Sequence, residues 1–546
     1  MERSSLKFLV IIFLFLIQLL KAQGIYVPAN HPIYSFLERM EAYGIIENYQ
    51  NETKPLQRTK VVDYLTKIFN NRFELNSADK KFLNYYIEEF NVDITGTLDK
   101  YDILFVNKGY NPFSQKEKFI YAYHDHSNLS FFVKAHINFG TYYSKNEKPS
   151  NFLEAGGRFF GSLSRFIGFE FDGKNGVILG DKSSALKTHE LSYNFKLTEK
   201  PESKFFDRAY GYISIEAPYF GLKVGKDRKL LGYGLNKLIL SDYPPDFESI
   251  NFNMNYRSFS FEYLHGWLQK QSEKPFSSFV SDTSKPYEKK YFVLHRISFS
   301  PIKNMKLGIG ESVIYLRTSP QLDYLNPFNF YKSIEHQLGD KDNALLFFDL
   351  EILPLKNLRI YSTFLIDDID FSKIGTKWYG NKTAFNLGLN LYNLITEFPL
   401  HFLIEYTRIE PYTFTHHLPE RNYTNLGYSL STDQPPNSYR LDYGINFTPS
   451  PEFDLVAIYS FTKWGRNYNI SDKIINVGGD INFGKREEDS DFVTFLDGQV
   501  ETINTIKILA YYEIFRNIKL STMFNLSKKG SQPSSLILSF GLISFL

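Results

Sequence analysis

A few clusters of histidine and aspartate are the positions in this chain that could bind a metal ion. His124-Asp125-His126 places two ring nitrogens two residues apart, and Asp367, Asp368 and Asp370 follow one another at the start of a loop. Zinc needs more ligands than this pair of histidines offers. The carboxylates suit either a calcium ion or a plain solvated turn, and the turn is the simpler interpretation. We therefore predict no metal site and no cofactor.

Catalytic chemistry has equally little support in the sequence. The chain contains no Cys, so thiolate nucleophiles, thiolate metal sites and disulfides are excluded. No Ser, His and Asp residues form a local set, and only a barrel-embedded lipase assembled from distant residues stays open as an alternative. The glycine-rich stretch Gly225–Gly234 lacks the Lys-Ser/Thr ending of a phosphate loop. We predict that the protein is not an enzyme.

Aromatic side chains are the stronger candidates for binding. The three tryptophans all fall near the outer ends of predicted strands, where they could form a membrane-interface girdle. They could instead stack against the apolar face of a sugar ring, together with tyrosines of one long loop. The glycan-binding candidates are Trp267, Trp378, Trp464, Tyr412, Tyr423 and Tyr428.

Composition and the N-terminus indicate where the protein works. The 546 residues include 62 Lys+Arg and 60 Asp+Glu, a balance that gives no support for a nucleic-acid partner. Arg3 and Lys7 precede an apolar stretch, Phe8–Leu20, which is shorter than the roughly 20 residues of a membrane-spanning helix. Residues 1–22 are therefore expected to be a signal peptide, with Ala22 as the small residue at the cleavage site.

The rest of the chain changes from helical to strand-like patterning. Residues 23–110 contain three short amphipathic segments and are expected to form a helical region that plugs or caps the periplasmic side. From about residue 129 onward, polar and apolar residues alternate, as in Tyr439–Phe447 and Phe385–Leu391. This period of two is typical of transmembrane strands. We expect residues 111–546 to form an all-β, antiparallel outer-membrane β-barrel of about eighteen strands.

Turn lengths separate a barrel from a soluble sandwich. Short connections containing Pro or Asn recur at 301–304, 354–357, 450–452 and 515–517, and the connections between these hairpins are long. Short periplasmic turns that alternate with long outer loops are typical of outer-membrane barrels. The pattern therefore predicts that every long loop lies on the cell exterior. Outer-membrane lipid and the barrel insertion machinery are the partners that this location implies.

Several short stretches of sequence, in the same order along the chain, resemble those of Wzi-type capsule assembly proteins. The main one is a signature loop that contains Asp227, Arg228, Gly232, Gly234, Asn236 and Asp242. Further similar stretches are Leu325-Asn326-Pro327-Phe328, Phe364–Asp368, His416-His417 and the N-terminal segment from Asn30 to Arg39. The resemblance implies an outer-membrane barrel lectin that anchors capsular or extracellular polysaccharide at the cell surface.

One alternative function is a porin or export channel for hydrophilic solutes, because a barrel of about eighteen strands is wide enough for an aqueous lumen. In that case inward-facing Arg359, Arg440 and Asp442 would tune selectivity, whereas in a lectin they would brace an occluded interior. We expect the loop 226–249 to fold inward as part of such a block.

Overall fold

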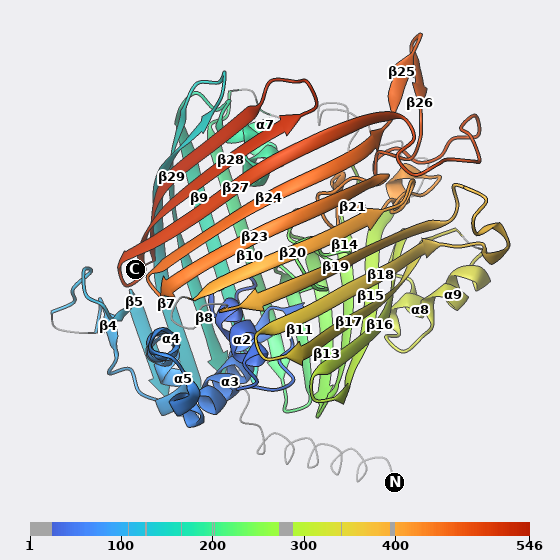
Figure 1. The fold of residues 1–546 in the computed structure, drawn as a ribbon. Helices are drawn as coiled ribbons and strands as arrows, with labels where there is room; N and C mark the ends of the chain where they lie inside the picture. Colours follow the sequence, from blue (N-terminus) through green and yellow to red (C-terminus); the bar gives the residue numbers. More distant parts are fainter. Residues whose placement is uncertain are drawn as a thin grey trace, which may run out of the picture.

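The structure, a computed structural model, describes residues 24–545 apart from 107–108, 126–127, 165, 199, 201, 272–287, 340 and 394–398. The predicted signal peptide, residues 1–22, lies outside the described residues, as does His126. Figure 1 shows one barrel with a group of helices at one end.

The barrel is built from eighteen antiparallel strands, and β29 closes it by pairing with β7. A further short strand, β6 (Tyr121–Asp125), continues the edge of β7 beyond β29. The fold class and the strand number predicted from the alternation are confirmed. The strands are β7 (Leu129–Ser144), β8 (Ser150–Leu163), β9 (Ile167–Gly180), β10 (Phe205–Glu216), β11 (Phe220–Lys226), β13 (Glu248–Tyr256), β14 (Phe259–Leu268), β15 (Lys289–Ile302), β16 (Met305–Arg317), β17 (Asn343–Leu355), β18 (Leu358–Asp368), β19 (Lys382–Tyr392), β20 (Leu400–Ile409), β23 (Ser438–Ser450), β24 (Phe453–Arg466), β27 (Gln499–Phe515), β28 (Ile518–Lys529) and β29 (Ser535–Phe545).

The two ends of the barrel differ in the length of their connections. Two-residue turns such as Arg257-Ser258 and Lys356-Asn357 join strands at one end, called here the plug end. Long connections gather at the other, the outer end, where residues 410–437 and 467–498 are two examples. Arg257 and Asn357 both take positive φ, which tight hairpins require. The predicted alternation of short turns and long loops is confirmed.

Side chains alternate across the barrel wall as the period of two demands. On β23, Tyr443 and Ile445 are exposed on the outside, whereas Asp442 is buried inside. On β19, Leu387 is exposed and Asn386 is buried. An apolar outward band around a polar interior is the pattern of a transmembrane barrel. Within the described part of the chain, no helix combines the length and apolar character needed to span a bilayer.

Four helices near the N-terminus form a compact unit at the plug end (Figure 1). They are α2 (Ile33–Ala42), α3 (Arg58–Asn70), α4 (Ser77–Glu89) and the short α5 (Asn91–Thr95). The helix α3 begins at Arg58, with Gln57 at the N-cap position. Asn76 caps α4, since its side chain accepts a hydrogen bond from Asp79 N–H. The apolar stripes meet in one core that includes Phe36, Leu65 and Phe82.

Ion pairs join this helical unit to the inside of the barrel wall. Lys306 of β16 pairs with Glu41 at 2.9 Å, and Arg516, in the turn between β27 and β28, lies 3.5 Å from Glu89. Arg359 of β18 lies 3.4 Å from Glu38. These anchors come from strands spread around the barrel, so the helices sit across its mouth.

Smaller elements complete the fold. The strands β1 (Tyr26–Val27), β2 (Thr53–Lys54), β3 (Leu56–Gln57), β4 (Tyr101–Ile103) and β5 (Glu117–Phe119) accompany the helices. The outer connections hold α6 (His189–Ser192), α7 (Phe195–Thr198), β12 (Leu230–Leu231), α8 (Leu322–Leu325), α9 (Tyr331–Gln337), β21 (Thr424–Asn425), β22 (Tyr428–Ser429), β25 (Tyr468–Ile470) and β26 (Lys473–Ile475). The short turns of 3-10 helix are 72–74, 185–187, 371–373 and 419–421.

Candidate functional site

The loop 227–247 leaves the outer end and folds down into the lumen, as the sequence led us to expect. Its strand β12 pairs antiparallel with β2 of the helical unit, Leu230 opposite Lys54. The N–H of Gly232 then donates to the carbonyl of Glu52 at 2.9 Å. One outer loop is thus hydrogen-bonded to the helical unit at the plug end.

Gly234 explains why this loop is rich in glycine. Its φ is +82°, a left-handed conformation that L side chains rarely adopt. A Cβ at this position would overlap the carboxylate of Glu405 and lie 2.7 Å from the ring of Tyr361. Glu405 in turn accepts hydrogen bonds from the backbone N–H groups of Leu235 and Asn236, at 2.9 and 2.8 Å. The absence of a side chain lets the loop seat against β20.

Asn236 links the inward loop to the wall that faces it. Its amide nitrogen donates to Glu405 at 2.8 Å and to Asp442 at 2.7 Å. Its carbonyl oxygen accepts from Arg440 at 3.0 Å and from Thr432 at 3.1 Å. With its oxygen and both amide contacts used, this buried residue fixes the inward loop to a polar cluster on the wall.

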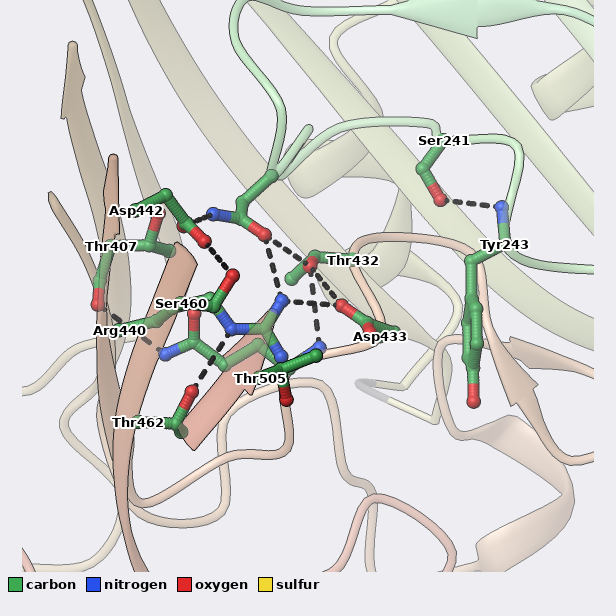
Figure 2. A network of polar contacts seen from close by, with 12 residues as sticks. Ser241, Tyr243, Thr407, Thr432, Asp433, Arg440, Asp442, Ser460, Thr462 and Thr505 are labelled. Carbon is green, nitrogen blue, oxygen red and sulfur yellow. Dashed lines mark hydrogen bonds and ion pairs between the residues drawn. The ribbon is translucent and has the colours of Figure 1, made fainter. Parts of the chain in front are cut away.

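The polar side chains around Asn236, called here the vestibule, are a charge pair and several hydroxyls on the inner side of the wall. Arg440 binds Asp433 at 2.6 Å and Thr462 at 3.2 Å. Ser460 of β24 and Thr505 of β27 lie on the same side of the wall (Figure 2). Such a set can donate to and accept from a polyhydroxylated ligand.

The electrostatics of the vestibule are simple at neutral pH. Enclosure raises the pKa of Asp433, but Arg440 outweighs this effect and holds that pKa below its usual range. The carboxylate is therefore ionised, and 53% of its surface stays exposed and able to accept further bonds. Burial raises the pKa of Tyr243 to about 12, so that its hydroxyl remains a donor.

Four aromatic rings from three outer loops gather beside the vestibule. His189 stacks on Tyr243 with ring centres 4.4 Å apart, and Tyr428 meets both edge-on at 5.5 and 5.7 Å. Tyr193 completes the group, 5.6 Å from Tyr428. We call these four rings the aromatic cluster. Apart from Tyr428, its members were missed by sequence reasoning, because nothing in the sequence brings the loops at 181–204, 227–247 and 410–437 together.

The lumen is not filled evenly. Inward side chains on β14 and β16, such as Ser260, Leu264 and Ile314, are buried under the loops. On β27, by contrast, Lys507 and Tyr511 share the face of Thr505 and are exposed. The inner face of β27 therefore stays accessible from Thr505 toward the plug end.

The other glycan-binding candidates lie in several places. Trp464 shares the inner face of β24 with Thr462, half-buried, with Lys529 over its ring. Trp378 lies half-buried in the loop 369–381, where Lys373 covers its ring. Trp267 lies on the outer wall of β14 beside Tyr291, which fits the membrane girdle that the sequence left as an alternative.

Tyr412 and Tyr423 are different, because both are completely buried. The Tyr412 hydroxyl donates to the carbonyl of Asn476 at 3.0 Å, and that of Tyr423 to Ile239 at 2.8 Å. Neither ring offers a face to a ligand here. Both hold the outer loops against one another.

The charged members of the signature loop brace its entry into the lumen. Asp227 pairs with Lys223 at 2.6 Å, and Arg228 pairs with Asp246 at 3.1 Å. Asp242 is exposed. Together with Gly232, Gly234 and Asn236, this run forms the inward loop itself.

The groups considered for metal binding are placed without a shared centre. His124 contacts Ser130 at 2.8 Å, and Asp367 is buried and accepts from the N–H of Phe414. Asp370 instead turns to the N–H of Ser372 at 3.0 Å. Among the described residues, no three His, Cys, Asp or Glu side chains are arranged to hold a metal ion.

Comparisons with known proteins agree with this geometry. The family model of capsule assembly protein Wzi matches residues 123–528. The solved structure of Wzi from Escherichia coli, described as an outer-membrane carbohydrate-binding β-barrel, is similar with a TM-score of 0.58. That similarity covers 95% of this chain and 98% of that one, at 13% identity. The Pseudomonas aeruginosa proteins OprD and OccK8 (OprE) give TM-scores of 0.44 and 0.46 at 10% and 11% identity, covering 76% of this chain and 95% and 98% of theirs. A comparison with curated protein sequences finds no match.

Proposed function

The chain belongs to the capsule assembly protein Wzi family and is an outer-membrane β-barrel, and from that premise we propose that it is a non-enzymatic lectin. In this proposal it holds capsular or extracellular polysaccharide at the cell surface, and residues 1–22 and 23–110 serve as signal peptide and periplasmic plug. The single observation that carries the proposal is the vestibule, where the Asp433–Arg440 pair and several hydroxyls lie beside the aromatic cluster.

The chemistry of the vestibule suits a sugar. A pyranose presents hydroxyls around its rim and an apolar C–H face, which aromatic rings can cover. Tyr243 and Tyr428 supply rings that are only partly buried, and Asp433 and Arg440 supply charge-assisted hydrogen bonds. The one ionised pair carries opposite charges that cancel, and the other groups of the site are neutral. The site therefore favours an uncharged or weakly charged glycan over a strongly charged one.

A passive channel is the alternative, and the described interior speaks against it. The helical unit lies at the plug end, and the inward loop is hydrogen-bonded to it through the N–H of Gly232 and the carbonyl of Glu52. Solutes that enter along the inner face of β27 therefore meet the helical unit, where the Tyr85 hydroxyl donates to Glu513 at 2.8 Å. Purified protein in planar bilayers is expected to show little conductance, whereas large steps would favour a porin.

Retention of polysaccharide on cells tests the proposal. The double variant Tyr428→Ala with Asp433→Ala removes one ring and one acceptor of the vestibule, and we expect it to release polysaccharide into the medium. Tyr219→Ala is the matched control, because it removes an exposed ring from a turn at the plug end. Trp378→Ala tests the outer loop surface separately.

If the double variant keeps polysaccharide on cells as well as the control does, and Trp378→Ala alone releases it, the site lies on the loop surface and not in the vestibule. If none of the three releases it, the lectin function itself is refuted. Folded protein in the outer membrane must be equal in all strains, which heat-modified mobility on gels measures.

A further inference from the structure

One long connection does not join the others at the outer mouth. Residues 318–339, called here the strap, contain α8 and α9 and lie against the outside of the barrel wall (Figure 1). Tyr324 and Tyr331 are fully buried beneath the strap, packed with Tyr263, Tyr315 and Val313 of the wall. The strap is therefore a packed part of the exterior and not a loose loop.

The orientation of the wall beneath the strap follows from its register. Glu262 and Leu264 of β14 point inward, because Glu262 pairs with Lys229 of the inward loop at 2.8 Å. Their neighbours Phe261, Tyr263 and His265 consequently point outward. On β16, Glu311 lies opposite His295 and two residues from Ile309, which is exposed on the outside.

The wall under the strap is unusually polar for a surface that faces lipid. His295 lies 3.2 Å from Glu311, and its other ring nitrogen is 2.9 Å from the carbonyl oxygen of Pro327 in the strap. Glu311 also accepts from the N–H of Tyr331 at 2.8 Å. A charged side chain on the lipid face of a barrel costs about 2–4 kcal/mol near the midplane. The strap shields Glu311 and His295 from lipid and supplies their hydrogen-bond partners.

The opposite face of the strap is apolar at its tip. Leu322, Phe328 and Phe330 are 80%, 71% and 59% exposed. Phe328 stacks on Phe261, with ring centres 5.3 Å apart. Phe261 is only two residues past Phe259, where β14 begins after its plug-end turn, so the tip reaches well down the outward band.

We propose that the strap is inserted into the lipid bilayer, with the rings of Phe328 and Phe330 among the lipid acyl chains. Lipid is the expected occupant of this surface, because the tip is continuous with the outward apolar band at Ile297, Phe299 and Ile309, which themselves face lipid. The exposed polar residues Asp323, Ser333, His336 and Gln337 lie on the helices, where headgroups can solvate them. Asn326, exposed at the tip, donates its amide N–H to Asn329 at 2.9 Å. The strap thus replaces a polar strip of wall with a lipid-compatible surface.

Because the chain contains no Cys, single cysteines can report the surroundings of the strap directly. Phe328→Cys and Phe330→Cys, each carrying a nitroxide label in reconstituted protein, are compared with two controls. Ile309→Cys marks the lipid-facing wall, and Phe371→Cys marks an exposed outer loop. Collisions with oxygen report lipid, and collisions with a water-soluble nickel complex report solvent.

Both strap labels are expected to match Ile309→Cys, with strong oxygen and weak nickel accessibility. If they match Phe371→Cys instead, the strap lies in water and the proposal is overturned. Thermal unfolding checks that each labelled protein is folded. Since all four positions are exposed, their replacement leaves the core intact, and this outcome is independent of whether the vestibule binds a glycan.

Discussion

Substitution of Gly234 should release the inward loop from the lumen, and Gly232 provides a matched control. Both glycines have positive φ, so an alanine at either one costs about 1–2 kcal/mol of backbone strain. At Gly232 an added Cβ meets only Ile239, at ordinary contact distance of 3.5 Å. At Gly234 it would overlap the carboxylate of Glu405. The difference between the two variants therefore isolates the contacts with Glu405 and with the Tyr361 ring that is bonded to it.

The size of that difference follows from the hydrogen bonds that Glu405 must give up as it moves. It accepts from Leu235 N–H at 2.9 Å, from Asn236 N–H at 2.8 Å and from the hydroxyl of Tyr361 at 2.6 Å. Each hydrogen bond to a charged group contributes about 1.5–3 kcal/mol. The loss of one bond lowers the ratio of seated to released loop by about ten- to a hundredfold, since about 1.4 kcal/mol is a factor of ten.

Labelling of Ser241→Cys measures the released population. Ser241 is buried in the seated loop and lies beyond Asn236 on the same segment. We expect a membrane-impermeant maleimide to react at least about tenfold faster in Gly234→Ala than in Gly232→Ala, both in the Ser241→Cys background, because labelling follows the open fraction. Equal rates in the two backgrounds would refute the claim that Glu405 seats the loop.

Two further predictions concern the helical unit. Burial raises the pKa of Glu38, but Lys54 and Arg359 outweigh this effect and lower it to about 2, so its stabilisation of the closed state is present above pH 4.5 and lost as the pH falls toward 2. Wild-type protein in planar bilayers should accordingly gain conductance over that pH range. Glu38→Gln should already conduct more than wild type at pH 7. If the conductance of the variant rises with acid in the same way as that of wild type, this role of Glu38 is contradicted. Phe36→Ala removes a buried ring that stacks on Phe82, at a cost of about 3–5 kcal/mol. Limited proteolysis should then cut the helical unit while the barrel stays folded, and resistance equal to that of wild type would contradict the packing assigned here.

Much of the barrel could be predicted because its determinants are local. Strand alternation such as that of Tyr439–Phe447 needs only neighbouring residues, and the turns at 356–357 and 516–517 carry an Asn, which tolerates positive φ. The segment 190–196 also alternates, but it forms two short helices in an outer loop, since no strand edge is free to pair with it.

The routes of the loops could not be predicted in the same way, because they depend on contacts between distant residues. Leu230 pairs with Lys54, and Phe328 packs on Phe261. Neither pairing has a signal in local sequence pattern. The aromatic cluster depends on the same long-range geometry, and for that reason only Tyr428 of its four rings was a candidate from sequence. Conversely, Tyr412 and Tyr423 have the right residue type, yet both are buried.

Calorimetric titration of the purified barrel with oligosaccharides from the host's own capsule tests the central claim most directly. Wild-type protein and Tyr219→Ala are expected to bind alike, and Tyr428→Ala with Asp433→Ala should lose measurable binding. Because the pKa of Asp433 lies below its usual range, wild-type affinity should be flat between pH 5 and 8. Equal affinity of the double variant and wild type would contradict the account, since the sugar would then bind outside the vestibule.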